Sequence, residues 1–460
     1  MARSVESVNA VIKAYDVRGV VGDQIDDDFV RDVGAAFARL VRDEQTGTEP
    51  VHRVVIGHDM RASSPELSRA FAEGVTAQGL DVVLIGLAST DQLYFASGIL
   101  DCPGAMFTAS HNPAKYNGIK LCRAGAKPVG QDTGLAVIAG EVAAGVPMFD
   151  GPEGEITEQD LLAEYASFVR GLVNLADLRP LKIAVDAGNG MGGHTVPAVF
   201  EPMPVTVLPL YFELDGTFPN HEANPLDPAN LVDLQEHVRA TGADIGLAFD
   251  GDADRCFVVD ELGNPVSPSA VTALVAEREL SKEPGATIIH NLITSRAVPE
   301  LVEKLGGVAV RTRVGHSFIK QQMAETGAVF GGEHSAHYYF RDFWGADSGM
   351  LAALHVLAAL GEQDRPLSEL MREYEGYAAS GEINSTVADA SERTAAVVAA
   401  FGDRTVSVDR LDGVTVDLGD GAWFNLRASN TEPLLRLNVE ARTTADVDAL
   451  VAEILGVVRA

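Results

Sequence analysis

The chain has little cysteine and no surplus of positive charge. Its three cysteines, Cys102, Cys122 and Cys256, lack C-x-x-C spacing, so they indicate neither a disulfide framework nor a zinc site. The 66 acidic residues outnumber the 35 basic ones and give a net charge of −31. This charge argues against nucleic acid or an anionic membrane as a partner, and an anionic substrate must meet local basic clusters.

Long apolar runs are also missing. No stretch of 18 apolar residues occurs, and the opening residues MARSVESVNAVIKAYDVRG lack the sustained apolar core of a signal peptide. We therefore expect a protein of the cytoplasm. The 460 residues, of which 46% are hydrophobic, exceed one ordinary core, so several packed domains are expected.

Short β-rich runs alternate with helical patterns through most of the chain. Runs such as RVVIGHD and KIAVDAG have helical neighbours such as PELSRAFAEGVTAQG, an order that indicates α/β layers with largely parallel sheets. From about residue 376, strand-like and turn-rich stretches outnumber two helical segments, residues 390–402 and 444–458. The order predicts three α/β units followed by a smaller α+β domain.

The stretch TASHNPAKYNGIK places Ser110 directly after an apolar run and just before Asn-Pro, which favours a turn. Active sites of α/β proteins lie at such strand ends. Adjacent side chains point apart in an extended backbone, so Ser110 and His111 are not expected to act as a hydrolase pair.

The stretch DIGLAFDGDADRCFVVD carries Asp250, Asp252 and Asp254 after an apolar strand. In an extended backbone the alternate side chains share one face, and three converging carboxylates suit a divalent cation such as Mg²⁺. An EF-hand is disfavoured because Arg255 stands where that loop needs glycine. A solvated acidic turn is the competing interpretation.

Two further stretches carry ligand-binding chemistry. In GGEHSAH, Glu333, Ser335 and His337 alternate and can read sugar hydroxyls if the backbone is extended, although a polar edge strand is the plain alternative. In RASNTEP, one arginine and several hydroxyl and amide groups form a candidate phosphate cradle, with a hydroxyl-rich turn as its alternative. The members of this cradle are Arg427, Ser429, Asn430 and Thr431.

Other polar residues have ordinary explanations as turn or surface groups. They are Arg18, Asp59, Arg61 and His316. The glycine-rich DAGNGMGG after a strand departs from G-x-G-x-x-G spacing, so we expect no dinucleotide there.

With TASHNP, DGDADR, GGEHSAH and RASNTEP in this order, the sequence resembles the α-D-phosphohexomutase family, most closely its bacterial phosphomannomutase/phosphoglucomutase members. The resemblance runs from Tyr15 to the C-terminal domain. It implies three α/β mixed-sheet domains and a C-terminal α+β domain like the TATA-binding-protein fold, around a central cleft. The implied domains are residues 1–150, 151–260, 261–372 and 373–460.

The resemblance also implies the site. Ser110 is the expected phosphoserine, and it holds Mg²⁺ together with Asp250, Asp252 and Asp254. Expected catalytic helpers are Lys120, Arg18, His111 and His316. Expected substrate-binding residues are Tyr15, Arg255, Gly315, Glu333, Ser335, His337, Arg427, Ser429, Asn430 and Thr431.

The implied reaction moves phosphate reversibly between C6 and C1 of a hexose, through a hexose 1,6-bisphosphate that turns over in the cleft. Mannose and glucose phosphates are the expected substrates, and a monomer or homodimer is the expected assembly. Phosphoglucosamine mutase and a Mg²⁺-dependent sugar-phosphate phosphatase are the alternatives, and a non-catalytic sugar-phosphate sensor ranks last. One departure from the family is Ile293, where many members carry lysine.

Overall fold

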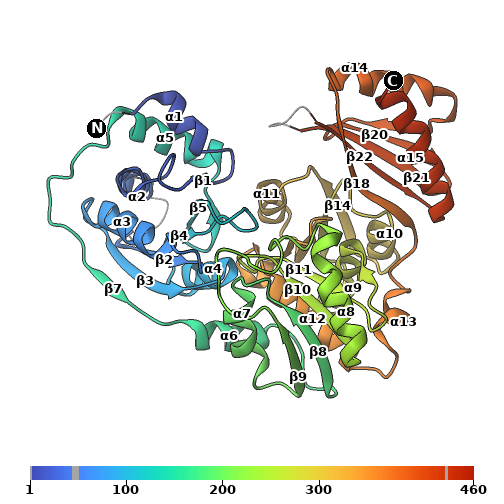
Figure 1. The fold of residues 1–460 in the computed structure, drawn as a ribbon, viewed down its shortest axis with the longest axis horizontal. Coiled ribbons are helices and arrows are strands. Elements are labelled where there is room, and N and C mark those ends of the chain that lie inside the picture. Colours follow the sequence, from blue (N-terminus) through green and yellow to red (C-terminus); the bar gives the residue numbers. More distant parts are fainter. Residues whose placement is uncertain (1–2, 44–50, 430–433) are drawn as a thin grey trace. The chain divides into compact units, whose positions relative to one another are not determined.

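The computed structural model describes residues 3–43, 51–429 and 434–460. Figure 1 traces the helices and strands of the chain, which forms two compact units. Unit 1 comprises Met1–Val266 and Ser335–Ser368, and unit 2 comprises Ser267–His334 and Glu369–Ala460. The chain thus leaves unit 1 once, returns to it, and ends in unit 2.

Unit 1 opens with a mixed sheet of seven strands in the order β1-β5-β4-β2-β3-β7, with β6 beside β5. Strands β4, β2, β3 and β7 are parallel, and β5 is antiparallel to both β4 and β1. The strands are β1 (Val17–Val20), β2 (Arg53–His58), β3 (Asp81–Leu87), β4 (Gly104–Phe107), β5 (Tyr116–Arg123), β6 (Lys127–Pro128) and β7 (Ile156–Glu158). The helices are α1 (Val5–Val11), α2 (Asp27–Asp43), α3 (Ser64–Thr76), α4 (Thr90–Ile99) and α5 (Leu135–Ala144), with a 3-10 turn η1 (Gln131–Thr133).

The second sheet of unit 1 has the order β12-β11-β10-β8-β9. Strand β8 is parallel to β9 and β10, whereas β11 is antiparallel to β10. The strands are β8 (Leu181–Asp186), β9 (Val205–Leu210), β10 (Ile245–Phe249), β11 (Cys256–Val259) and β12 (Pro265–Val266). The helices are α6 (Leu162–Gly171), α7 (Gly192–Phe200) and α8 (Val232–Thr241), with η2 (Pro228–Leu231). The acidic motif therefore occupies the turn between β10 and β11.

The returning segment of unit 1 is a hairpin followed by an apolar helix. It comprises β16 (Tyr338–Phe340), η3 (Arg341–Phe343), β17 (Ala346–Asp347) and α12 (Gly349–Gly361). Helix α13 (Leu367–Met371) crosses the limit between the units.

Unit 2 begins with a parallel sheet in which β13 lies between β14 and β15. These elements are α9 (Pro268–Lys282), β13 (Thr287–Asn291), α10 (Ala297–Lys304), β14 (Val308–Thr312), α11 (His316–Thr326) and β15 (Phe330–Gly332). An antiparallel sheet of order β18-β22-β21-β20-β19 completes the unit. Its elements are β18 (Ala378–Thr386), α14 (Ala390–Ala400), η4 (Gly402–Arg404), β19 (Ser407–Asp409), β20 (Val414–Gly419), β21 (Ala422–Ala428), β22 (Leu434–Ala441) and α15 (Thr444–Val458).

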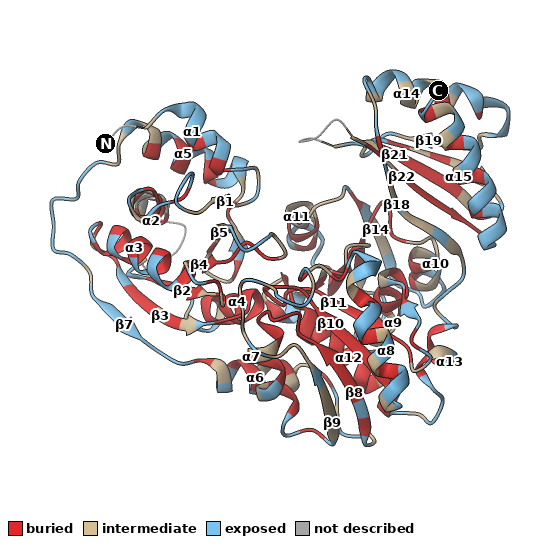
Figure 2. Ribbon diagram, viewed as in Figure 1, coloured by how far each residue is buried: buried red, intermediate tan, exposed pale blue. Residues whose placement is uncertain are grey.

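The apolar strands that the sequence places before its polar motifs form the core. Strands β4 (GAMF) and β10 (IGLAF) are buried at every position, and Figure 2 shows β8 and β10 within the buried interior of unit 1. Serines cap two helices that follow buried turns: Ser89 Oγ accepts the Gln92 N–H and Ser348 Oγ accepts the Leu351 N–H. The predicted fold class, α/β mixed sheets followed by an α+β domain, is confirmed. Among the described helices, none has the length and apolar character needed to cross a membrane.

Candidate active site

The three aspartates of DGDADR, here called the acidic cluster, converge in the turn after β10. Asp250, Asp252 and Asp254 are at most 1% exposed, and one carboxylate oxygen from each lies within 4.8 Å of the others. The backbone is a turn with Ala253 at φ +59°, so the expectation of an extended strand was wrong. The left-handed residue folds the chain back, and this turn brings the carboxylates together.

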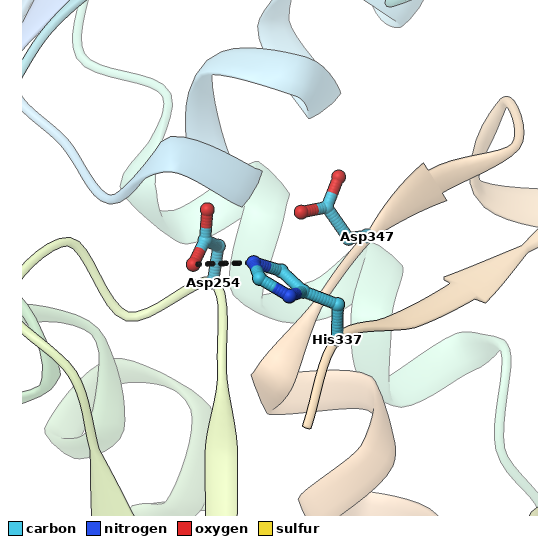
Figure 3. Close-up of side chains that lie close together, drawn as sticks. All are labelled: Asp254, His337 and Asp347. Atoms are coloured by element: carbon cyan, nitrogen blue, oxygen red, sulfur yellow. Dashed lines mark ion pairs between the residues drawn. The ribbon is translucent and has the colours of Figure 1, made fainter. Parts of the chain in front are cut away.

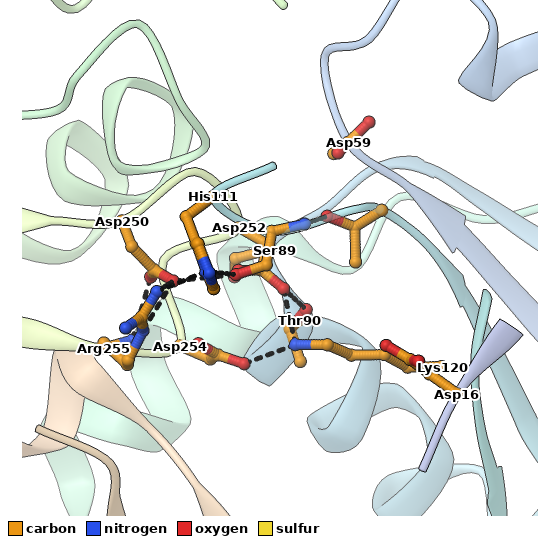
Figure 4. Close-up of polar contacts among 12 residues, drawn as sticks. Asp16, Asp59, Ser89, Thr90, His111, Lys120, Asp250, Asp252, Asp254 and Arg255 are labelled. Carbon is orange, nitrogen blue, oxygen red and sulfur yellow. Dashed lines mark hydrogen bonds and ion pairs between the residues drawn. The ribbon is translucent and has the colours of Figure 1, made fainter. Parts of the chain in front are cut away.

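One side of the acidic cluster is held by Lys120, which reaches it from β5. Its Nζ donates to Asp252 Oδ2 at 2.7 Å and to Asp254 Oδ2 at 2.6 Å (Figure 4). Burial opposes its charge, but the two carboxylates outweigh burial and raise the pKa of Lys120 well above its ordinary value. Lys120 therefore stays protonated and neutralises one of the three negative charges.

The other oxygens of these two aspartates remain available. Within the described residues, Asp252 Oδ1 and Asp254 Oδ1 are buried and accept no hydrogen bond. Buried carboxylate oxygens without a donor are costly, and hard divalent cations bind such oxygens. The acidic cluster therefore fits a metal ion of the Mg²⁺ class.

Asp250 links the acidic cluster to the serine. Its Oδ2 accepts the Ser110 hydroxyl at 3.0 Å and the Arg255 Nε–H at 2.9 Å. Burial raises the pKa of Asp250, Arg255 opposes this, and the charges of Asp254 and Asp252 add to it, giving a value of about 7. The negative charge of Asp250 is thus only partly compensated by the protein, which again favours a bound cation.

Ser110 lies in the turn after β4, only 5% exposed, with a left-handed φ of +48°. This backbone brings its Oγ to 3.2 Å from His111 Nδ1, so the expectation that the two side chains point apart was wrong. Arg255 Nη2 lies 2.7 Å from the same nitrogen, and burial together with nearby positive charges lowers the pKa of His111 to about 3. His111 is therefore neutral at pH 7, with Nδ1 acting as an acceptor.

The backbone around Ser110 is fixed by a buried arginine, although the sequence alone is explained by a turn or surface position for this residue. Arg61 and its partner Asp59 are 2% and 0% exposed, so that expectation was wrong. Arg61 Nη2 donates to the carbonyl oxygens of Ser110 at 2.9 Å and Asn112 at 2.7 Å, while its Nε donates to Asp59 at 3.1 Å. The Asp59–Arg61 spacing within GHDMR was visible in the sequence, but its burial was not.

Two glycines let the loops pack backbone to backbone. A Cβ on Gly251 would lie 2.4 Å from the Ser110 carbonyl oxygen, and one on Gly190 would lie 2.6 Å from the Gly251 carbonyl oxygen. Gly190 belongs to the DAGNGMGG segment, and the neighbouring Met191 N–H donates to the Gly251 carbonyl at 2.9 Å. That glycine-rich segment thus supports the acidic turn.

Arg18 and Tyr15 flank the serine turn at the start of the first sheet. Arg18, in β1, donates through Nη1 to Asn112 Oδ1 and through Nη2 to Asp16 Oδ2, each at 2.5 Å. Tyr15 precedes β1 and is 39% exposed. Arg18 is thus attached to the Ser110 turn, whereas Tyr15 is open to solvent.

The GGEHSAH stretch is a turn, and Ala336 within it has φ +64°. The expected extended arrangement was therefore wrong. Glu333 belongs to unit 2, is 2% exposed, and accepts the Gly315 N–H at 3.2 Å. Ser335 and His337 belong to unit 1 and lie 3.0 Å apart, Oγ to Nδ1.

His337 also adjoins the acidic cluster. Its Nε2 lies 3.8 Å from Asp254 Oδ1, and Asp347 approaches the same place from β17 (Figure 3). Asp254 thus belongs both to the acidic cluster and to a group with His337 and Asp347, so these two residues adjoin the cluster through Asp254.

In unit 2, two arginines face each other across β21 and β22. Arg427 pairs in register with Arg436, a residue that the sequence analysis missed, and each lies 3.5 Å from a different oxygen of Glu382. Within the described part of the chain, neither arginine Nε has a hydrogen-bond partner. Arg427 and Arg436, here called the arginine pair, leave donor capacity for an anion near Ser429.

Asn430 and Thr431 lie outside the described residues, and so does the side chain of His316, whose backbone begins α11. Ile293, which stands where many family members carry lysine, is 7% exposed in the turn after β13. Its apolar side chain supplies no positive charge at this position.

Comparison with known proteins gives the family. Residues 9–144, 163–263 and 267–377 match alpha/beta/alpha domains I, II and III of phosphoglucomutase/phosphomannomutase, and residues 382–457 match its C-terminal domain. "Phosphohexose mutases" of Xanthomonas campestris pv. campestris are 41% identical over 436 residues, covering 94% of this chain and 95% of theirs. The chain belongs to the phosphoglucomutase/phosphomannomutase family.

Two further proteins of the family match most or all of the chain. The phosphomannomutase of Escherichia coli K12 is 40% identical over 440 residues and 94% of both chains. The crystal structure of a phosphoglucomutase/phosphomannomutase family protein from Burkholderia thailandensis superposes with a TM-score of 0.88 at 33% identity, covering 100% of this chain and 98% of that one. The chain is therefore an isomerase of the phosphohexomutase type, with the four domains of its family.

Proposed function

We propose that this enzyme is a phosphomannomutase/phosphoglucomutase that works through a phosphoserine at Ser110. The observation that carries the proposal is the 3.0 Å contact between Ser110 Oγ and Asp250 Oδ2, beside two further buried carboxylates. A serine used only for structure has no need of three carboxylates that can hold a cation. A serine that carries phosphate needs a cation beside it, because the negative charge of the phosphate must be neutralised, and the three carboxylates can hold that cation.

Mg²⁺ is the proposed cofactor, held by the acidic cluster and by Ser110. When bound, it supplies positive charge to the phosphate oxygens during transfer. The protein's own contribution is a set of fixed charges: Lys120 and Arg255 hold the aspartates, and Arg18 holds the serine turn through Asn112. His111, whose pKa is lowered by burial and by nearby positive charges, is neutral at pH 7 and accepts a hydrogen bond from Arg255 at Nδ1.

The proposed substrates are mannose and glucose phosphates, with a hexose 1,6-bisphosphate as intermediate and activator. The similar proteins named above are called phosphohexose mutases and phosphomannomutase, which supports this class. Proposed readers of the sugar hydroxyls are Glu333, Ser335 and His337, with Tyr15 and Gly315 beside the substrate. The proposed distal phosphate site comprises Arg427, Ser429, Asn430 and Thr431, and His316 is a proposed electrostatic helper.

Three further expectations belong to the same proposal. We place the enzyme in the cytoplasm, where its three buried thiols stay reduced. We expect a monomer or a homodimer. We also expect the domain limits near residues 150, 260 and 372.

The test is a side-by-side measurement of kcat/KM for mannose, glucose and glucosamine 1-phosphates, with Mg²⁺ and the matching bisphosphate supplied and inorganic phosphate monitored. We expect mannose and glucose phosphates to be isomerised, glucosamine phosphate to be poor, and no steady phosphate release. If glucosamine 1-phosphate were the best substrate, the enzyme would be a phosphoglucosamine mutase. Turnover only with net phosphate release would identify a phosphatase and overturn the proposal.

A further inference from the structure

Thr90, the first residue of α4, contacts the acidic cluster twice from a distant part of the sequence. Its Oγ1 donates to Asp252 Oδ2 at 2.6 Å, and its backbone N–H donates to the Asp252 carbonyl oxygen at 3.0 Å (Figure 4). Thr90 and Asp252 are both 0% exposed. One residue therefore holds both the backbone and the side chain of an aspartate 162 positions later.

These contacts determine which Asp252 oxygen remains available. Thr90 and Lys120 both donate to Oδ2, at 2.6 and 2.7 Å, while Oδ1 accepts no hydrogen bond from the described residues. The terminal torsion of an aspartate is broad when nothing restrains it. Lys120 has a flexible stem and is shared with Asp254, so it restrains this torsion less firmly than the short side chain of Thr90.

Thr90 is itself fixed by contacts that do not involve the acidic cluster. The next residue, Asp91, is 0% exposed and accepts hydroxyl hydrogen bonds from Ser89, from Tyr165 at 2.7 Å and from Ser348 at 2.7 Å. Tyr165 lies in α6, and Ser348 is the N-cap of α12. The start of α4 is thus attached to two other helices of unit 1, which makes it a rigid support.

We propose that Thr90 is a positioning residue for the metal site: its hydroxyl holds Asp252 so that Oδ1 faces the ion. This inference rests on the metal site of the proposed function and adds a residue that touches neither metal nor substrate. Residues that orient metal ligands typically change metal affinity by about 10- to 100-fold when they are removed.

A purely structural role for the hydroxyl predicts a different outcome. A buried threonine hydroxyl that only satisfies its own hydrogen bond affects stability and leaves metal affinity alone. Thr272 provides the matched control, because it is also 0% exposed and donates to the Pro268 carbonyl at 2.9 Å, in unit 2.

The experiment measures Mn²⁺ binding by electron paramagnetic resonance, with Mg²⁺ as competitor, in wild type, Thr90→Val, Thr90→Ser and Thr272→Val. We expect Thr90→Val to weaken Mn²⁺ binding at least ten-fold, because valine keeps the shape and loses the donor. Thr90→Ser keeps the donor and should stay within about three-fold of wild type. Thr272→Val should bind Mn²⁺ as wild type does, and thermal unfolding of each variant separates stability from affinity.

The outcomes separate this inference from the proposed function. Equal Mn²⁺ affinity in wild type and Thr90→Val would overturn the positioning role and leave the metal site intact. A wild-type protein that binds neither Mn²⁺ nor Mg²⁺ would overturn the metal site as well. If Thr90→Val does not fold, Thr90→Ala against Thr90→Ser gives the same comparison, and equal affinity of those two would also refute the inference.

Discussion

The two charged sites of the molecule are built on opposite principles. The acidic cluster and Ser110 are buried, and contacts of 2.6 to 3.0 Å hold them in place. The arginine pair is partly exposed, and each arginine lies 3.5 Å from an oxygen of Glu382. The acidic cluster and Ser110 are held in place by short contacts, whereas the arginine pair makes only longer contacts with Glu382, a difference consistent with the proposed chemical and phosphate-binding roles.

The charges of the two sites show the same contrast. Around Ser110, three aspartate carboxylates converge and the side chains of Lys120 and Arg255 contact them, an arrangement that favours a bound cation. In the described part of the chain, the two arginines share Glu382 as an acidic neighbour. In a chain with a net charge of −31, such a local excess of positive charge is what an anionic substrate requires.

Replacing Ser110 by alanine should give the largest effect. Without the Oγ that is proposed to carry phosphate, mutase turnover should fall roughly 10⁴-fold, and phosphate on the serine turn should disappear from intact-mass and peptide maps. Ser68→Ala is the control, because Ser68 is a buried serine of the same unit that donates to the Pro65 carbonyl oxygen. If Ser110→Ala kept activity within ten-fold of wild type, the chemical step would not depend on the buried site. The proposed difference in role between this site and the arginine pair would then be refuted.

Replacing Arg427 by alanine should give an intermediate effect of a different kind. Losing one charged donor to phosphate should raise KM for the hexose phosphate by roughly 10- to 100-fold and change kcat by less than about five-fold. Arg427→Lys should recover only part of the loss, because an ammonium group lacks the planar fork of arginine.

Arg404→Ala provides the matched control for Arg427. Arg404 lies in the same domain, is about half exposed, and forms an ion pair with Glu453 at 2.8 Å. An equal rise in KM for Arg404→Ala would mean that the total positive charge of the domain attracts the substrate. Arg427 would then have no specific role in binding it. A loss of kcat at constant KM for Arg427→Ala would show that this residue acts in the chemical step. The proposed division between a reacting site at Ser110 and a binding site at the arginine pair would then be wrong.

The smallest predicted effect concerns acid stability of unit 2. Burial lowers the pKa of His290, in β13, to about 4. Between pH 6.5 and 4 the unfolded chain binds a proton that the folded one does not, so stability falls as the pH falls, by roughly 2 kcal/mol from pH 7 to 5. Asp91 of unit 1 gives stability the opposite dependence on pH. Burial raises the pKa of Asp91 to about 6, so its contribution to the free energy of unfolding is lost as the pH rises from about 4 to 6.

The two tryptophans allow the units to be followed separately. Trp344 lies in unit 1 and Trp423 in unit 2, so a Trp344→Phe background leaves fluorescence to report on unit 2 during urea unfolding. His290→Gln in this background should lose less stability between pH 7 and 5 than its parent. The control is His52→Gln, an exposed histidine, which should keep the parental loss. The same loss in all three proteins would show that His290 does not set the acid response.

Much of the site was predictable because its chemistry is local in sequence. The motifs around Ser110, Asp250 and Arg427 each follow or occupy an apolar strand, and the structure places the first two at the ends of β4 and β10. The predictions that were wrong concern the local backbone conformation of these motifs. Left-handed residues such as Ala253 and Ala336 are adopted under tertiary constraint, and alternation in the sequence gives no sign of them.

By itself, the sequence determined the fold class, the ordered motifs and the residue types able to carry phosphate and hold a cation. Those properties depend on periodicity and composition over a few residues. Only the tertiary structure decided that Arg61 is buried beneath the Ser110 turn, that Thr90 holds Asp252, and that Arg436 faces Arg427. Contacts between residues far apart in the chain depend on how the strands and helices pack, and no spacing within one motif encodes them.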